Sequence, residues 1–154
     1  MMIVSARMSK MLPPTFVLYC LLAMLLLHWA FPLASVASLI LVIIGLGSMV
    51  LGIVIAIAAE GQFRRAGTNV NTFGQPTKLV TDGWFSFSRN PMYLSLALML
   101  LGAWLTLGSV SPLVGILVFL LVTDRWYIAQ EEKRLAATFG KEYESYRRHT
   151  RRWL

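Results

Sequence analysis

Residues 11–59 read MLPPTFVLYCLLAMLLLHWAFPLASVASLILVIIGLGSMVLGIVIAIAA, with no Asp, Glu, Lys or Arg between Lys10 and Glu60. A transmembrane helix needs about 20 mainly apolar residues to cross about 30 Å of hydrocarbon, so this run is long enough for two helices. Pro32 fits poorly inside a helix, and the sequence around it predicts the turn between them. The fold is therefore expected to begin with a helical hairpin in the membrane.

A second apolar run lies between Arg89 and Asp124, and it also lacks Asp, Glu, Lys and Arg. Segment 108–112 (GSVSP) divides it, because Gly commonly ends a helix and Pro is favoured where the next helix opens. We therefore predict an all-α integral membrane helical bundle with about four transmembrane helices. With 154 residues the chain has room for a single domain, 1–154. The expected spans lie near 12–30, 35–59, 89–107 and 112–128.

The Lys and Arg residues are confined to segments 7–10, 64–89 and 125–152, and the two predicted turns carry no charge. An even number of spans places these segments on one side of the membrane, and the positive-inside rule makes that side cytosolic. The net charge of +7 then reflects topology and attraction to anionic membrane lipids, and no soluble basic domain remains to bind nucleic acid. We expect a multi-pass protein of the inner or plasma membrane with cytosolic N- and C-termini.

A signal peptide is the alternative interpretation of the first apolar segment, with Ser35-Val36-Ala37 as a cleavage site of small residues. The apolar run exceeds the usual length of about 7–15 residues, and cleavage would break the even-span charge pattern. His28 is expected to be a satisfied or interfacial side chain near the outer turn. The second span contains small residues that should let helices approach closely: Gly45, Gly47, Ser48 and Gly52.

Residues 60–88 are predicted to form a cytosolic loop of irregular structure, because they are too many for a simple connector. Asp82-Gly83 indicates a turn. Trp84, Phe85 and Phe87 place aromatic side chains where the chain returns to the membrane interface. The loop is expected to fold over a site or along the membrane surface.

The segment from Ser88 to Tyr93 predicts a helix start. Asn90 is a good N-cap, Pro91 suits the first helical position, and Arg89 can anchor to headgroups. A helix start of this kind also offers backbone amides and the positive end of the helix dipole to a carboxylate. Arg89 would add hydrogen-bond donors to this site, and Tyr93 lies in the first turn of the predicted helix.

Glu131 and Glu132 flank the apolar arc of a cytosolic amphipathic helix predicted over 129–146. Two adjacent carboxylates at the membrane boundary are costly unless a cation or hydroxyl donors satisfy them. They could be solvated at a helix start or could pair with Arg64 or Arg65. A ligand that carries a positive group and hydroxyls would explain both acids at once.

These residues form two motifs. The stretches LVTDGWFSFSRNPMY at 79–93 and EEKRLAATFGKEYESY at 131–146 resemble the signature of the isoprenylcysteine carboxyl methyltransferase and phospholipid methyltransferase group. In that family the first motif has Arg, then His or Asn, then Pro-x-Tyr, and the second has Glu-Glu, Leu, Phe-Gly and two Tyr. Both occur here in the same order with an apolar hairpin between them, and the similarity covers roughly residues 60–150.

The resemblance implies methyl transfer from S-adenosylmethionine to a lipophilic acceptor, the carboxylate or amine of a lipid or lipidated molecule, at the cytosolic face. Arg89 or Arg147 could orient an acidic acceptor, and these two are the candidate catalytic residues. No metal site is predicted. Asn90 stands where the prenylcysteine enzymes have His, as in the phospholipid-type members, and the tail 147–153 departs from the basic stretch with Val and Pro that is frequent in the family. By the resemblance, the expected cofactor-binding residues are Arg89, Asn90, Pro91, Tyr93, Glu131 and Glu132.

Three other classes of protein have to be weighed. A nicotinamide-dependent membrane reductase of the sterol or steroid type can have a similar C-terminal half, but no basic cluster for a 2′-phosphate is evident. A small four-span transporter usually needs an ionisable residue deep in a span, and His28 is the single candidate in the uncharged runs besides Cys20. The third alternative is a non-catalytic membrane scaffold.

Overall fold

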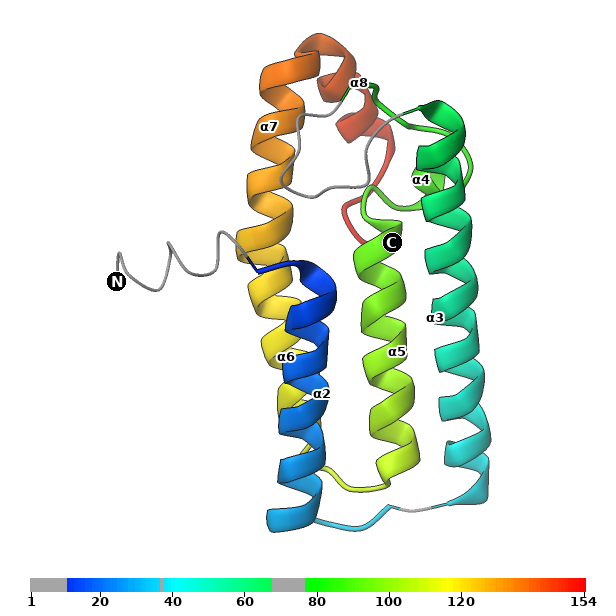
Figure 1. Cartoon of the computed structure of the whole chain (residues 1–154), viewed down its shortest axis with the longest axis vertical. Coiled ribbons are helices and arrows are strands. Elements are labelled where there is room, and N and C mark those ends of the chain that lie inside the picture. Colours follow the sequence, from blue (N-terminus) through cyan, green and yellow to red (C-terminus); the bar gives the residue numbers. More distant parts are fainter. Residues whose placement is uncertain (1–10, 37, 68–76) are drawn as a thin grey trace, which may run out of the picture.

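The computed structural model describes residues 11–36, 38–67 and 77–154. Four apolar helices form a bundle: α2 (Pro13–Ala30), α3 (Leu39–Ala66), α5 (Pro91–Leu107) and α6 (Leu113–Val122) (Figure 1). Within these described ranges, three helical stretches are long and apolar enough to cross a membrane, namely Pro13–Ala30, Leu39–Ala66 and Leu113–Phe139, and Pro91–Leu107 is a shorter apolar helix. The prediction of an all-α membrane bundle is confirmed.

The bounds of the second helix differ from the expected 35–59. Helix α3 starts only at Leu39: Ser38 is extended, and backbone hydrogen bonds from Val36 to Gly108 (2.8 Å) and from Val110 to Leu33 (2.9 Å) join the two uncharged turns before it. At its other end α3 continues to Ala66 and stops where Gly67 adopts a left-handed conformation (φ 69°). The irregular loop predicted over 60–88 is therefore wrong for its first seven positions and for Trp84–Phe87, which form a helical turn; positions 68–76 lie outside the described residues.

Glycines bring α3 and α5 into close contact. A Cβ atom on Gly45 would lie 2.7 Å from the carbonyl oxygen of Gly102, and one on Gly52 would lie 2.7 Å from that of Ser95. The hydroxyl of Ser48 donates to the carbonyl of Leu98 at 2.9 Å. The packing prediction is confirmed for these positions but is wrong for Gly47, which has nothing within 4 Å of its Cβ position.

The uncharged end of the bundle satisfies its few polar groups internally. The imidazole of His28 lies 2.7 Å from the hydroxyl of Ser109, whose carbonyl accepts the indole N–H of Trp104 at 2.9 Å. The hydroxyl of Ser111 donates to the carbonyl of Leu27 at 3.3 Å. His28 is thus a satisfied structural side chain, as expected.

The fourth apolar helix of the bundle continues without interruption from α6 through a π-helical segment, η1 (Thr123–Ile128), into α7 (Ala129–Phe139). The single helix predicted over 129–146 is wrong, because Gly140 has a positive φ of 50° and the chain reverses there. Helix α8 (Lys141–His149) then folds back over the bundle end (Figure 1). This return brings Tyr143 and Tyr146 into an apolar cluster with Ala59, Val80 and Phe85.

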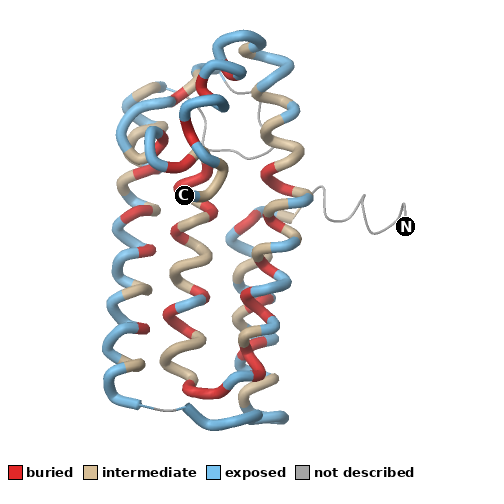
Figure 2. The backbone as a smooth tube through the Cα atoms, turned by 180° about the vertical axis from the view of Figure 1, so that it is seen from behind, coloured by how far each residue is buried: buried red, intermediate tan, exposed pale blue. Residues whose placement is uncertain are grey.

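Burial follows the inside of this arrangement. Buried residues lie where the helices face each other and beneath α8, whereas long stretches of α2 and α3 are exposed on their outer sides (Figure 2). Those outer sides are apolar; Leu39, Ile40 and Ile57 are between 66% and 75% exposed. Such surfaces suit contact with lipid rather than water.

Candidate functional site

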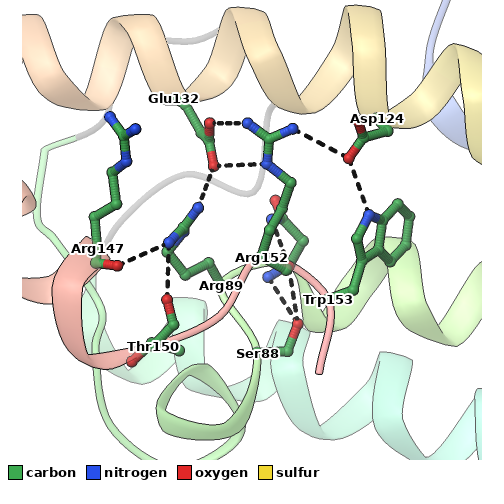
Figure 3. A network of polar contacts seen from close by, with 9 residues as sticks. Ser88, Arg89, Asp124, Glu132, Arg147, Thr150, Arg152 and Trp153 are labelled. Atoms are coloured by element: carbon green, nitrogen blue, oxygen red, sulfur yellow. Dashed lines mark hydrogen bonds and ion pairs between the residues drawn. The ribbon is translucent and has the colours of Figure 1, made fainter.

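Arg89 joins three parts of the chain at the charged end of the bundle (Figure 3). It lies between the single turn α4 (Trp84–Phe87) and the start of α5. Its Nη2 donates to Glu132 Oε1 on α7 at 2.7 Å, and its Nη1 donates to the carbonyls of Thr150 (2.8 Å) and Arg147 (3.0 Å). The structure therefore brings the two sequence motifs into direct contact.

Arg152 lies on the other side of Glu132 and contacts both of its carboxylate oxygens. Its Nη1 also donates to Asp124 Oδ1 at 3.1 Å, and the indole of Trp153 donates to the same oxygen at 3.0 Å (Figure 3). The hydrogen bond to Glu132 is the main cause that raises the pKa of Arg152 above its ordinary value. Glu132 pairs with Arg89 and Arg152, so the alternative of a pairing with Arg64 or Arg65 does not hold for this acid.

Asn90 and Pro91 occupy the N-cap and first helical positions, as predicted, but the Asn90 side chain makes no capping hydrogen bond. Its amide instead donates to the carbonyl of Arg152 at 2.9 Å, and its backbone N–H donates to the Ser88 hydroxyl at 3.1 Å. The returning C-terminal chain presents a carbonyl close by, and the amide bonds to it. The prediction that the Asn90 side chain caps the helix is therefore wrong. Its side chain instead holds the C-terminal segment against the start of α5.

Tyr93 and Glu131 form a second contact between the motifs. The Tyr93 hydroxyl donates to Glu131 Oε2 at 3.2 Å, and the Tyr93 ring lies 6.3 Å from that of Tyr127 in η1. Adjacent acids thus have different surroundings. Glu132 forms ion pairs with two guanidinium groups, whereas Glu131 accepts a hydrogen bond from the Tyr93 hydroxyl and is acted on by the charge of Arg134.

Arg147 takes part through its backbone carbonyl, which accepts from Arg89, while the residue itself is exposed. Sequence reasoning missed three members of the network: Asp124, Arg152 and Trp153. The available signal was the sign of the charges, since an acid opens the last charged segment and the tail is strongly basic. Nothing in the sequence showed which arginine would reach which acid.

Two buried polar atoms of this region have no hydrogen-bond partner among the described residues, the Nε of Arg89 and the hydroxyl of Tyr143. Burial, followed by the charge of Glu132, raises the pKa of Tyr143 to about 12, so its phenol is a neutral donor near pH 7. The neighbouring Tyr146 differs: burial also raises its pKa, but its hydroxyl donates to the Phe85 carbonyl at 2.6 Å. Each of these donors is left without an acceptor by the described residues, which is uncommon for a buried polar group.

Comparison with known proteins identifies relatives that match part of this chain. An uncharacterized protein of Haemophilus influenzae is 46% identical over 63 residues, which are 41% of this chain and 100% of that protein. The protein-S-isoprenylcysteine O-methyltransferase of Schizosaccharomyces pombe is 37% identical over 73 residues, which are 46% of this chain and 30% of the yeast protein. No solved structure matches the chain.

The model of the phospholipid methyltransferase family matches residues 40–142. This range begins in α3, ends in α8 and includes Arg89, Tyr93 and both adjacent glutamates. On this match, the chain belongs to the phospholipid methyltransferase family.

Proposed function

We propose that this membrane protein transfers a methyl group from S-adenosylmethionine to a lipophilic acceptor at the charged end of its bundle. The observation that carries the proposal is the pairing of the Arg-Asn-Pro-x-Tyr helix start with the Glu-Glu helix, through Arg89–Glu132 and Tyr93–Glu131. Membership of a methyltransferase family supports it independently. A position where polar groups meet the membrane suits a water-soluble methyl donor and a lipid-soluble acceptor.

The residues present fit this donor, which carries a carboxylate, an ammonium group, ribose hydroxyls and a sulfonium. Glu132 already has two guanidinium partners, so it is a poor site for another cation. Glu131 has the Tyr93 hydroxyl as its hydrogen-bond partner and Arg134 as the nearby positive charge, and it forms no ion pair among the described residues, so it is the better acid for the ammonium group or the ribose hydroxyls. The spare donors of Arg89 and Tyr143 suit the carboxylate or a hydroxyl. In this proposal Asn90 and Pro91 act by fixing the start of α5.

When bound, S-adenosylmethionine supplies a methyl carbon already activated by the positive sulfur. The chain then has to place the acceptor in line with that carbon and keep water away. Both Nη groups of Arg89 are occupied in holding Glu132 and the tail, so in this proposal Arg89 contacts the methyl donor through Nε and does not orient the acceptor. The exposed Arg147 is the candidate that orients an acidic acceptor from the side of α8.

The acceptor is proposed to be the carboxylate or amine of a lipid or a lipidated molecule that arrives through the bilayer. The family name points to a phospholipid, and the Schizosaccharomyces pombe relative is named for a prenylated cysteine. A carboxylate needs no base, whereas an amine must arrive deprotonated. We further propose that the charged end faces the cytosol, with both termini on that side, in accord with the positive-inside rule.

The test uses the full chain purified in detergent. S-adenosylhomocysteine should raise its unfolding temperature in a dose-dependent manner, whereas NADPH should leave it unchanged. Stabilisation by NADPH alone would instead support a membrane reductase. Membranes incubated with methyl-labelled S-adenosylmethionine and then separated into lipid and protein fractions should show label in lipid or in lipidated protein. Absence of both the thermal shift and the label would refute the proposal.

A further inference from the structure

A groove of about 560 Å³ lies on the outside of the bundle, between α3 and α4. None of the residues that line it takes part in the polar network around Glu132. The groove is within the usual size of small-molecule sites, about 300–1,000 Å³. Its lining residues are Ile57, Ala58, Gly61, Gln62, Arg65, Gly83, Trp84 and Phe87.

The walls of the groove change from apolar to basic along α3. Ile57 and Phe87, which are 66% and 72% exposed, form apolar walls. Arg65 stands two turns further toward the charged end of the helix, a rise of about 12 Å. Gln62 and Trp84 line the groove between its apolar part and Arg65. The Gln62 amide is polar, and the Trp84 indole is a group typical of the membrane interface. None of the eight lining residues is acidic.

The side of the groove formed by Gly83 and Trp84 is held against α3 by hydrogen bonds between the Gln62 side chain and backbone groups. The Gln62 amide oxygen accepts the backbone N–H of Trp84 at 3.1 Å, and its nitrogen donates to the Asp82 carbonyl at 3.4 Å. A Cβ atom on Gly83 would lie 1.7 Å from the Gln62 nitrogen, so the glycine permits this close approach. These contacts hold the α4 side of the groove at a fixed distance from α3, while the exposed side chains of Ile57 and Phe87 form its apolar walls.

We infer that this groove binds one phospholipid whose headgroup carries a net negative charge, with its phosphate at Arg65 and an acyl chain along Ile57 and Phe87. The charge of the lining residues indicates which class of lipid headgroup should bind. Arg65 attracts a phosphate, while no lining carboxylate is present to receive the ammonium group of a zwitterionic lipid. The inference does not depend on methyl transfer, since it concerns a surface separate from Arg89 and Glu132.

Binding can be measured by titrating the detergent-purified full chain with short-chain phosphatidylglycerol or phosphatidylcholine and following its unfolding temperature. Phosphatidylglycerol should stabilise the protein at concentrations where phosphatidylcholine has no effect. Arg65→Gln should weaken the phosphatidylglycerol effect about tenfold, because a charge-assisted hydrogen bond is lost. Arg64→Gln is the matched control, since Arg64 is a neighbouring exposed arginine that does not line the groove. Equal effects of the two substitutions would show attraction by general surface charge and would overturn the inference.

A second pair of variants tests the groove itself. Nothing lies within 4 Å of the Cβ position of Gly61 or of Gly47, so a leucine fits on α3 at either position. Gly61→Leu should fill the groove and abolish the preference for phosphatidylglycerol, whereas Gly47→Leu should preserve it. Equal stabilisation by both lipids, or an undiminished preference in Gly61→Leu, would overturn the inference.

Discussion

The guanidinium of Arg89 and the carboxylate of Glu132 meet at 2.7 Å, although 43 residues separate them in the sequence. This contact connects the start of α5 with α7, and both side chains are largely buried, with 10% and 14% of their surfaces exposed. A buried ion pair adds little net free energy to folding, because the cost of removing water from the two charges offsets their Coulomb attraction. Its main effect is to fix the positions of the two side chains. Removing the Arg89–Glu132 contact should therefore disturb the geometry of the site more than the packing of the apolar helices.

Replacing Arg89 by lysine should lower stability by about 1–3 kcal/mol, because one ammonium group cannot reproduce a planar fork of donors. The native side chain reaches Glu132, Thr150 and Arg147 together. Unfolding in detergent followed by circular dichroism would measure the change. Arg147→Lys is the control and should be neutral, since Arg147 contributes its carbonyl and its side chain is exposed. Equal stability of the two variants would refute this assignment.

The adjacent acids should separate into a ligand-binding residue and a structural residue. Glu131→Gln should keep the fold and weaken S-adenosylhomocysteine binding at least about tenfold, as expected for loss of a charge-assisted contact. Glu132→Gln should lower the unfolding temperature, because Arg89 and Arg152 would then face a neutral amide. Calorimetric binding and thermal unfolding of both variants give the comparison. The reverse pattern would exchange the two roles.

Tyr143→Phe should weaken S-adenosylhomocysteine binding about fivefold, the size of one neutral hydrogen bond. The Tyr143 hydroxyl is buried and has no partner among the described residues, so removing it should not destabilise the free protein. Tyr146→Phe is the contrasting variant, because it loses the hydrogen bond to the Phe85 carbonyl and should be less stable. Unchanged affinity in Tyr143→Phe would place the ligand elsewhere.

Stability should fall at alkaline pH partly through the same tyrosine. Burial raises the pKa of Tyr143 to about 12 in the folded protein. An unfolded tyrosine has a pKa of about 10, so the stabilisation that comes from keeping this phenol neutral is complete below about pH 10 and lost between about pH 10 and 12. Unfolding temperatures measured across this range should fall less steeply for Tyr143→Phe than for the unchanged protein. Parallel curves would mean that the phenol ionises as easily in the folded state as in the unfolded one.

The contact between α3 and α5 should not accept a methyl group at its narrowest point. A Cβ atom on Gly102 would lie 2.4 Å from the carbonyl oxygen of Gly45, so Gly102→Ala should cost about 1–3 kcal/mol. Gly47→Ala on the open side of α3 should be neutral or stabilising by up to about 1 kcal/mol, because alanine favours the helix. Denaturant unfolding in detergent would compare the two, and similar stability would contradict the close packing.

The apolar helices could be predicted from the sequence because an uncharged run in a bilayer has few alternatives to a helix. Pro32 and the GSVSP segment located the turns, and Pro91 located the start of α5. The early end predicted for the second helix was wrong, because Glu60, Arg64 and Arg65 were read as loop when they continue α3 beyond the apolar run. Charge indicates where a span leaves the bilayer, and it does not indicate where the helix ends.

The site was only partly predictable. The motif residues Arg89, Tyr93, Glu131 and Glu132 do come together, as their resemblance to the family implied. The roles of Asp124, Arg152 and Trp153 could not be read from the sequence, because they depend on the reversal at Gly140 that carries the tail back to α5 and η1. The same reversal diverts the Asn90 side chain from capping to the Arg152 carbonyl.

The paired turns at the uncharged end have a mechanical consequence for the opposite end. Ser35 and Ser109 form a bridge there, and His28 binds Ser109, so the helices are joined where no charge is present. Relative tilting of helices that are joined at one end displaces them most at the other, which is where Arg89 and Glu131 lie. The Ser109 bridge therefore limits how far the helices can separate at the charged end, together with the Arg89–Glu132 contact that joins α5 to α7 there.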